Sequence, residues 1–226
     1  IPGRLQRFEL KNKVAKEARL EPLAKILARS KTNLRALDKQ LDIDTFVKFW
    51  AVESLTGFWD GYANNQNNYF VYENPADSRL VFIPWGMDDA FTNVMPIPPY
   101  RLKIKSVHGN ATLPVRLYAQ SKTRSLYRNT LVKLMGDIWD EKELAAELDR
   151  LEDLLGDATP SSQRDFPKAL NKVRGFISKR RQTLKRELDR WPLDVRTDPK
   201  VPVYFAVTGK ATGTFSTKWN EKAPKD

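Results

Sequence analysis

The first part of the chain carries apolar residues at helical spacing. Between residues 21 and 41 these residues predict helix, with a break near residues 30–33. A more strongly patterned helix follows, because one stripe carries Ile43, Phe46, Val47, Trp50, Ser54 and Leu55. Asp42 or Asp44 can cap the start of that helix, and Gly57 can end it. We expect the stripe to be a core face that fixes the position of the loop after it.

Two short apolar runs come next and predict a β-hairpin. They are YFVY at residues 69–72 and LVFI at residues 80–83, separated by the turn-forming residues 74–78. Asp60 lies in a loop before the first run, and Asp88 lies in a loop after the second. Because the two strands of a hairpin run in opposite directions, we expect Asp60 and Asp88 to lie at the same end of it.

The rest of the chain is predicted to be mostly helical. After Phe91 the sequence is irregular and rich in proline, and we expect a loop there. Three helices should follow, the first from Pro114 to about Leu134, the second started by a capping box of Asp140 and Glu143 and ending at Gly156, and the third running from Phe166 to Trp191.

These elements together predict an α+β fold, mostly helical, with a β-hairpin inserted between helices. The composition, 41% hydrophobic and 30% charged, is that of an ordinary globular protein. We expect residues 1–191 to form one unit, and residues 192–226 to be a linker with a β-strap or the start of a further domain. The first residue is not Met, so we take the chain as a piece of something longer. No run of apolar residues is long enough to predict a membrane span.

Charge and residue usage narrow the chemistry. The net charge of +11, with a pI near 9.7, favours acidic partners. Cysteine is absent, which excludes disulfides, thiolate nucleophiles and cysteine-based zinc sites. The single histidine, His108, excludes a histidine-rich metal site and argues against a Ser-His nucleophile.

The last predicted helix carries a basic face that has two interpretations. Its members are Lys179, Arg180, Arg181, Lys185 and Arg186. They could contact an acidic substrate or nucleic acid, but a solvated helical face is the preferred interpretation. The face has no interleaved aromatic residues, so there is no clear signal for nucleic-acid binding by stacking.

Residues 59–91 combine acids and amides in the loops around the hairpin. Phosphoryl transfer needs a carboxylate that orients and deprotonates the attacking hydroxyl, together with oxygen ligands for Mg²⁺. Asp60 and Asp88 could supply the carboxylates, and Asn65 or its rival Asn68 could supply an amide oxygen. Asp-Gly and Asn-Asn pairs are also ordinary turn formers, so the residues alone leave a purely structural interpretation open.

Three motifs in this stretch resemble the CotH family of atypical kinases, which is named for a spore-coat protein. They are the DGY loop at residues 60–62, the asparagine-rich approach to an aromatic strand, and the I-P-W-x-x-D-x-x-F loop at residues 83–91. The preceding DIDTFVKFWAVESLTG at residues 42–57 is similar too. The resemblance covers residues 1–95 well and the helical remainder loosely. It implies the mostly helical C-terminal lobe of an atypical protein-kinase-like fold.

The resemblance also implies an activity and roles for individual residues. The activity would be transfer of the γ-phosphoryl group of ATP, with Mg²⁺ or Mn²⁺, to an acidic or hydroxyl-rich protein, secreted or in a bacterial cell envelope. Asp60 would be the catalytic base and Asp88 the main metal ligand. Asn65 or Asn68 would be a further metal ligand, and Asp89 a possible helper.

Two departures from the family pattern leave alternatives open. Family members often carry an acid directly after the Pro-Trp pair, where this chain has Gly86. The nucleotide-binding lysine belongs to an earlier N-terminal lobe that is not in this chain, and Lys11 and Lys13 are better explained as solvated loop residues. A catalytically impaired pseudokinase and a structural or adhesive surface module therefore remain alternative functions.

Overall fold

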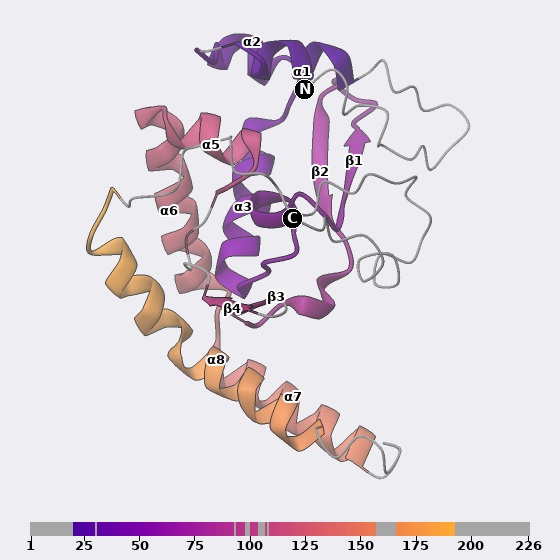
Figure 1. Ribbon diagram of the computed structural model, residues 1–226, viewed down its shortest axis with the longest axis vertical. Helices are drawn as coiled ribbons and strands as arrows, with labels where there is room; N and C mark the ends of the chain where they lie inside the picture. The colour runs from indigo at the N-terminus through magenta and orange to yellow at the C-terminus, as the bar shows by residue number, and fades with distance from the viewer. Residues whose placement is uncertain are drawn as a thin grey trace. The chain divides into compact units, whose positions relative to one another are not determined.

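The structure is a computed structural model that describes residues 20–29, 31–92, 94–97, 100–103, 107, 109–156 and 166–192 (Figure 1). Lys11, Lys13, His108 and the expected strap after residue 192 lie outside the described residues. Contacts divide the chain into two compact units, one of residues 1–41 with 202–226 and the other of residues 42–201.

The described part of the first unit is helical, with the break that the sequence predicts. Helix α1 spans Glu21–Leu27 and helix α2 spans Leu34–Asp38. Asn33 caps α2, because its side chain accepts a hydrogen bond from the Ala36 N–H at 3.0 Å.

Helix α3, Ile43–Thr56, is the central element of the second unit. Asp42 is its N-cap and accepts a hydrogen bond from the Thr45 N–H at 3.0 Å. Gly57 ends it in the left-handed region at φ +65°. The chain also passes close by there, since a Cβ on Gly57 would lie 2.3 Å from the Thr92 carbonyl oxygen. Both helix ends are therefore where the sequence predicts them.

The predicted hairpin is present and packs on α3 through aromatic side chains. Strands β1 (Tyr69–Glu73) and β2 (Leu80–Pro84) are antiparallel, with Tyr69 opposite Pro84 and Glu73 opposite Leu80. Phe82 stacks on Tyr69 at 5.4 Å between ring centroids and meets the edge of Phe46 of α3 at 5.1 Å. A short helix, α4 (Tyr62–Asn65), precedes the hairpin, and a 3-10 helix (Met87–Asp89) follows it.

The sequence predicted a loop for the proline-rich stretch after Phe91, and the structure differs. It contains a second antiparallel pair, β3 (Val94–Ile97) and β4 (Tyr100–Lys103). Pro96 lies opposite Arg101 in this ladder. A two-stranded ribbon has only edge strands, and an edge strand tolerates a residue without an N–H. Proline therefore did not exclude a strand here.

The helix predicted over residues 114–134 is in fact two helices. They are α5 (Thr112–Tyr118) and α6 (Ser121–Asp137). At the break the Thr123 hydroxyl donates to the Leu117 carbonyl, and the Arg124 guanidinium donates to the Tyr118 carbonyl at 3.2 Å. These side chains add hydrogen bonds to carbonyl groups at the end of α5, which stabilises the break.

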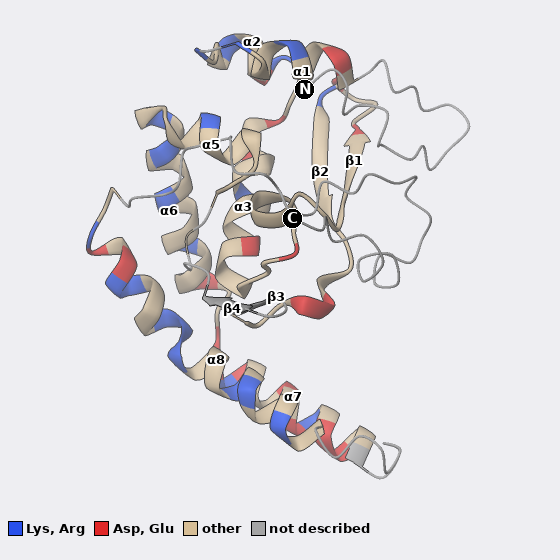
Figure 2. Cartoon of the chain, viewed as in Figure 1, with Lys and Arg blue, Asp and Glu red and all other residues tan. Residues whose placement is uncertain are grey.

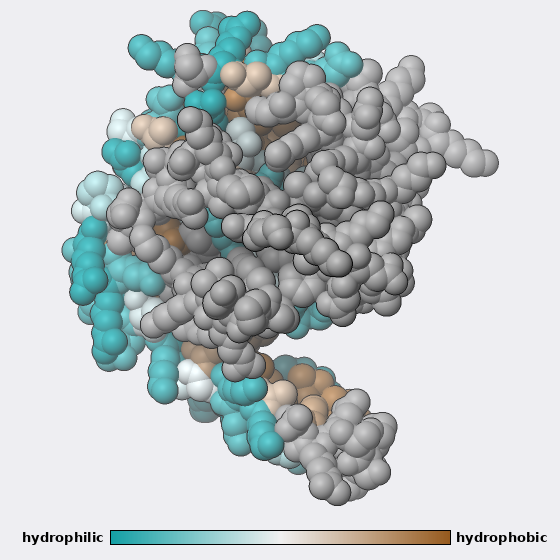
Figure 3. Space-filling model, in the orientation of Figure 1, coloured by the Kyte–Doolittle hydropathy of each residue, from teal (hydrophilic) through white to brown (hydrophobic). Residues whose placement is uncertain are grey.

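Helices α7 (Glu141–Gly156) and α8 (Phe166–Leu188) lie side by side (Figure 1). Asp140 caps α7 by accepting the N–H groups of Lys142 and Glu143. Charges on facing sides also connect the pair (Figure 2), since Arg174 of α8 bonds both Asp149 and Glu152 of α7 at 2.6 Å. The end of α7 also exposes Leu154, and brown, apolar surface lies over the α7–α8 pair in Figure 3.

The described part of the chain is thus α+β, mostly helical with two small antiparallel hairpins. None of the helices in the described part of the chain is long and apolar enough to span a membrane.

Candidate active site

Asp60 lies at the end of the β1–β2 hairpin, surrounded by side-chain amides. Its Oδ1 accepts from Asn65 Nδ2 at 2.5 Å. Its Oδ2 accepts from Asn68 Nδ2 at 2.6 Å and from Asn67 Nδ2 at 3.2 Å. Asp60 is only 8% exposed. Asn65, Asn67 and Asn68, the amide cage, therefore hold both oxygens of one buried carboxylate.

Burial dominates the electrostatics of Asp60. Desolvation raises its pKa to about 6, while the hydrogen bonds from Asn65 and Asn67 act in the opposite direction. The negative charges of Asp89 and Asp88 raise the pKa further. The structure thus brings the three acids close enough to interact, at the same end of the hairpin as the sequence predicts. At neutral pH Asp60 is ionised and more basic than an ordinary aspartate.

Asn68 joins the two loops of the site. The Trp85 N–H donates to the Asn68 carbonyl at 3.0 Å, which ties the loop after β2 to the residue before β1. Gly86 follows at φ +54°, and a Cβ on it would lie 3.3 Å from Asn68 Oδ1 and 3.6 Å from Asp88 Oδ1. The Asn68 amide nitrogen therefore faces Asp60, while its oxygen lies on the side of Gly86 and Asp88.

The donor atoms at this end of the hairpin are oxygens of Asp60, Asp88, Asp89 and the cage amides. In the described ranges, no three His, Cys, Asp or Glu side chains come close enough together to bind a metal ion by themselves. Mg²⁺ typically takes one or two protein carboxylates and completes its shell with substrate phosphates and water. A set of hard oxygen donors with few carboxylates therefore fits Mg²⁺ that arrives with a nucleotide, and does not fit a soft metal.

One buried acid at the site was missed by the sequence analysis. Glu53 of α3 is 0% exposed and accepts the N–H groups of Tyr62 and Ala63, each at 2.8 Å. Desolvation raises its pKa to about 8, against the lowering effect of these two hydrogen bonds. The Glu53 carboxyl packs directly against Gly61. A side chain at position 61 would collide with it, because a Cβ on Gly61 would lie 2.3 Å from Glu53 Oε1. The available signal was a carboxylate in the last turn of the helix, beside the apolar stripe.

A second support comes from the start of α5. The N–H groups of Asn110 and Ala111 both donate to the Ala63 carbonyl, at 2.8 and 3.1 Å. The Asn110 side chain also donates to the Asn64 side chain. The helix α4, which separates Asp60 from the hairpin, is thus held on both sides.

The two tryptophans that flank the loops differ in environment. Trp59 is buried, at 7% exposed. Trp85 is 61% exposed and packs on Phe70, with 5.0 Å between ring centroids. Most of the Trp85 ring therefore faces solvent beside the site.

The basic face predicted on α8 is only partly solvated. Arg180 is 2% exposed and donates to the carbonyl oxygens of Ser54 and Leu55, at 2.8 Å for Leu55. Its guanidinium also lies 4.7 Å from the centre of the Phe176 ring. Helical spacing alone placed Arg180 among surface charges, but it bonds carbonyl groups in the last turn of α3.

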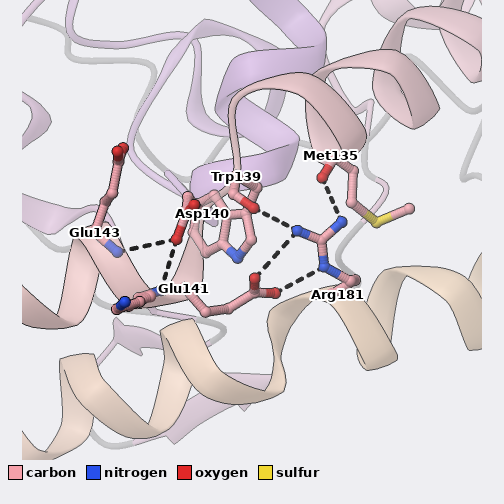
Figure 4. Close-up of polar contacts among 7 residues, drawn as sticks. Met135, Trp139, Asp140, Glu141, Glu143 and Arg181 are labelled. Carbon is pink, nitrogen blue, oxygen red and sulfur yellow. Dashed lines mark hydrogen bonds and ion pairs between the residues drawn. The ribbon is translucent and has the colours of Figure 1, made fainter.

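Arg181 also has partners in this unit, although its side chain is 42% exposed (Figure 4). It donates to Glu141 at 2.8 Å, to the Met135 carbonyl at 2.6 Å and to the Trp139 carbonyl. These contacts tie α8 to the connection between α6 and α7. Two of the five predicted surface cations therefore have structural partners.

Comparisons with known proteins identify the family. Residues 6–184 match the family described as CotH kinase protein. Two curated relatives come from Rhizopus delemar: Invasin CotH3, 34% identical over 77 residues, and Invasin CotH2, 31% identical over 68 residues. These stretches cover 32% and 30% of this chain, and 13% and 11% of the relatives, so the chain matches a small part of their length. Because the family match spans well over half of its length, this chain belongs to the CotH kinase protein family.

Proposed function

We propose that this chain carries the phosphoryl-transfer site of an atypical protein kinase, which uses Mg²⁺ or Mn²⁺ and ATP to phosphorylate hydroxyl groups of an acidic or hydroxyl-rich protein. The observation that carries the proposal is the placement of Asp60. Its carboxylate is held by the amide cage at the same end of the hairpin as Asp88. A turn of purely structural purpose needs no buried aspartate with a raised pKa.

Asp60 would be the general base. It orients the attacking hydroxyl and accepts its proton at a carboxylate oxygen, as the bond to the γ-phosphorus forms and the bond from that phosphorus to the ADP leaving group breaks. Burial supports this role, because a pKa of about 6 makes the carboxylate ionised at neutral pH yet a better proton acceptor than a solvated aspartate. The amide cage keeps the carboxylate in one orientation without supplying a competing cation.

Asp88 would be the main metal ligand. Asn68 is favoured over Asn65 as the amide ligand, because the Asn68 oxygen lies on the same side of Gly86 as the Asp88 carboxylate. Asp89 would act as a helper through its charge. When bound, Mg²⁺ would neutralise the charge of the nucleotide phosphates. The nucleotide lysine is expected outside this chain.

The test compares two acid-to-amide changes in the full-length protein, with γ-phosphate transfer from ATP to casein, an acidic and serine-rich acceptor, as the readout. Asp60→Asn should lower kcat by at least about a hundredfold with little change in nucleotide affinity, because it removes a contact made in the transition state. Asp88→Asn should weaken Mg²⁺-dependent nucleotide binding, because it removes a ligand from the ground-state complex.

The matched control is Asp77→Asn, the same change at the turn between β1 and β2. Asp77 bonds Arg79 at the far end of the hairpin from Asp60. The Asp77→Asn change should leave the rate of phosphate transfer unchanged. Equal and modest effects of all three changes, without Mg²⁺ dependence, would contradict the kinase proposal.

A second candidate, an adhesive surface module, is favoured by the names of the curated relatives, which are invasins. Such a module would bind acidic polymers through solvated cations such as Lys179 and Lys185, and Gly86 would then mark a pseudokinase site. Binding to heparin that survives Asp60→Asn and is lost above about 0.5 M salt, with no phosphate transfer, is the result expected for this candidate.

A further inference from the structure

The loop that carries Asp60 is anchored by one side chain from the preceding helix. Glu53 lies in the last turn of α3, and its two carboxyl oxygens accept separate backbone N–H groups, Oε1 from Tyr62 and Oε2 from Ala63, both at 2.8 Å. Glu53 is fully buried. A buried carboxyl is costly to desolvate, so its presence in an apolar helix calls for a specific role.

The two amides that Glu53 holds lie between the proposed base and its cage. Tyr62 and Ala63 are the first residues of α4, which begins two positions after Asp60 and ends at Asn65. Asn65 donates to Asp60 at 2.5 Å. Any rotation of the backbone at Tyr62 would therefore move Asn65, the closest amide donor, relative to the Asp60 carboxylate.

The helical turn that presents Glu53 is itself held on two sides. The Tyr127 hydroxyl of α6 donates to the Ser54 hydroxyl at 2.7 Å. Arg180 of α8 donates to the carbonyls of Ser54 and Leu55. Glu53 therefore extends to the loop from a helical turn that is held in place, as accurate placement of a functional group requires.

We infer that Glu53 is a positioning residue, whose carboxyl clamps the Tyr62 and Ala63 amides and thereby sets the orientation of Asp60 and Asn65. The inference rests on the proposed function for its catalytic consequence. Glutamine cannot replace Glu53 fully, because its side chain offers one acceptor oxygen and one NH₂ group. One of the two backbone N–H groups would then face another donor. Gly61 is part of the same arrangement, since any side chain at that position would clash with Glu53 Oε1.

The test compares Glu53→Gln with Tyr127→Phe. The second change removes a buried hydrogen bond to the same turn of α3 without touching the loop, and phenylalanine can keep the stacking on Trp50. Both variants should unfold more readily. Only Glu53→Gln should lower kcat, by about tenfold to a hundredfold, with a KM for ATP within about threefold of the wild type. Equal kcat losses in the two variants would overturn the inference.

A second readout does not depend on catalysis. In NMR spectra, Glu53→Gln should shift the side-chain NH₂ resonances of Asn65 and Asn67, which bond Asp60, whereas Tyr127→Phe should leave them in place. Unchanged resonances in Glu53→Gln would count against positioning. A wild-type protein that transfers no phosphate would overturn the proposed function, while these resonances would still decide the role of Glu53.

A third measurement needs no variant and covers the case in which Glu53→Gln fails to fold. Hydrogen exchange of the Tyr62 and Ala63 amides in the wild type should be slow, comparable to amides in the middle of α3, because both donate to a buried acceptor. Exchange as fast as that of exposed turn amides, such as Ala76, would show that Glu53 does not clamp the loop.

Discussion

Asn68 donates its side-chain N–H to Asp60 Oδ2 at 2.6 Å and directs its amide oxygen toward Gly86. One residue thus contacts the proposed base and faces the loop of the proposed metal ligand. Asn65 contacts Asp60 as well, at 2.5 Å. The position of the Asn68 amide oxygen beside Gly86 distinguishes Asn68 from Asn65, its equivalent rival in the sequence.

Replacing these asparagines should have distinguishable effects. We expect Asn68→Ala to raise the Mg²⁺ concentration needed for half-maximal transfer by about tenfold, because the change removes an oxygen beside Asp88. Asn65→Ala should lower kcat with little change in the Mg²⁺ requirement. The measurement is the rate of transfer as a function of Mg²⁺ at saturating ATP. The same Mg²⁺ curve for both variants would mean that Asn68 is not the ligand.

A substitution at Gly86 can test how the absence of an acid after the Pro-Trp pair affects the binding of Mg²⁺-ATP. Gly86→Asp would place a carboxylate near Asn68 Oδ1 and Asp88 Oδ1, and we expect tighter binding of Mg²⁺-ATP. Because the backbone at position 86 is left-handed, at φ +54°, the Gly86→Asp variant should have a free energy of unfolding lower by about 1–2 kcal/mol.

The matched control for this prediction is Gly86→Asn, which has the same shape and no charge. It should show a similar loss of stability without the gain in Mg²⁺-ATP affinity, as measured by calorimetric titration. Equal affinities for the two variants would place the side chain at position 86 away from the metal.

The core under the site can be tested through Trp50. Its ring is fully buried and stacks on Tyr127 with 3.7 Å between ring centroids. Trp50→Ala should lower the free energy of unfolding by about 3–5 kcal/mol, measured by urea denaturation. The matched exposed change is Trp85→Ala, which should cost far less because most of that ring faces solvent. A loss below about 1 kcal/mol for Trp50→Ala would mean that α3 is not a core helix.

The buried carboxyl of Glu53 predicts a pH dependence of stability. Its pKa is about 8 in the folded protein and near 4.5 when solvated, so the folded state holds the proton more tightly. The stabilisation from this group is complete below pH 4.5 and is lost as the pH rises through about 8, at about 1.4 kcal/mol per pH unit. Tyr62 and Tyr69 face Glu53, and burial raises their pKa values, so they stay neutral in this range.

The measurement is the free energy of unfolding of the wild type and of Glu53→Gln between pH 5 and pH 8. The advantage of the wild type over the variant should fall across this range, because glutamine does not titrate. Carboxyls with lowered pKa values, such as Asp140, affect both proteins equally. Asp60, with a pKa of about 6, titrates in both proteins, so the comparison above pH 7 isolates Glu53. A constant difference would indicate that the pKa of Glu53 is not raised.

Local sequence alone determined the elements whose signals lie within a few residues. The sequence placed the start of α3 at Asp42 or Asp44 and its end at Gly57, and the structure has Asp42 as the N-cap. Capping and left-handed φ depend on the residue itself and its nearest neighbours. The β1–β2 hairpin followed from two apolar runs around turn formers, and its antiparallel geometry brought Asp60 and Asp88 to one end. Side-chain type and order in the chain were sufficient for these predictions.

Only the tertiary structure decided the partners of residues that are distant in the chain. Arg180 reads as a surface cation, yet it lies 125 residues from the Leu55 carbonyl that it bonds. Glu53 reads as one acid in a helix, and its role depends on a loop that folds back onto it. The physical reason is that buried polar groups must find partners wherever the fold brings them, and periodicity along the chain does not record those encounters.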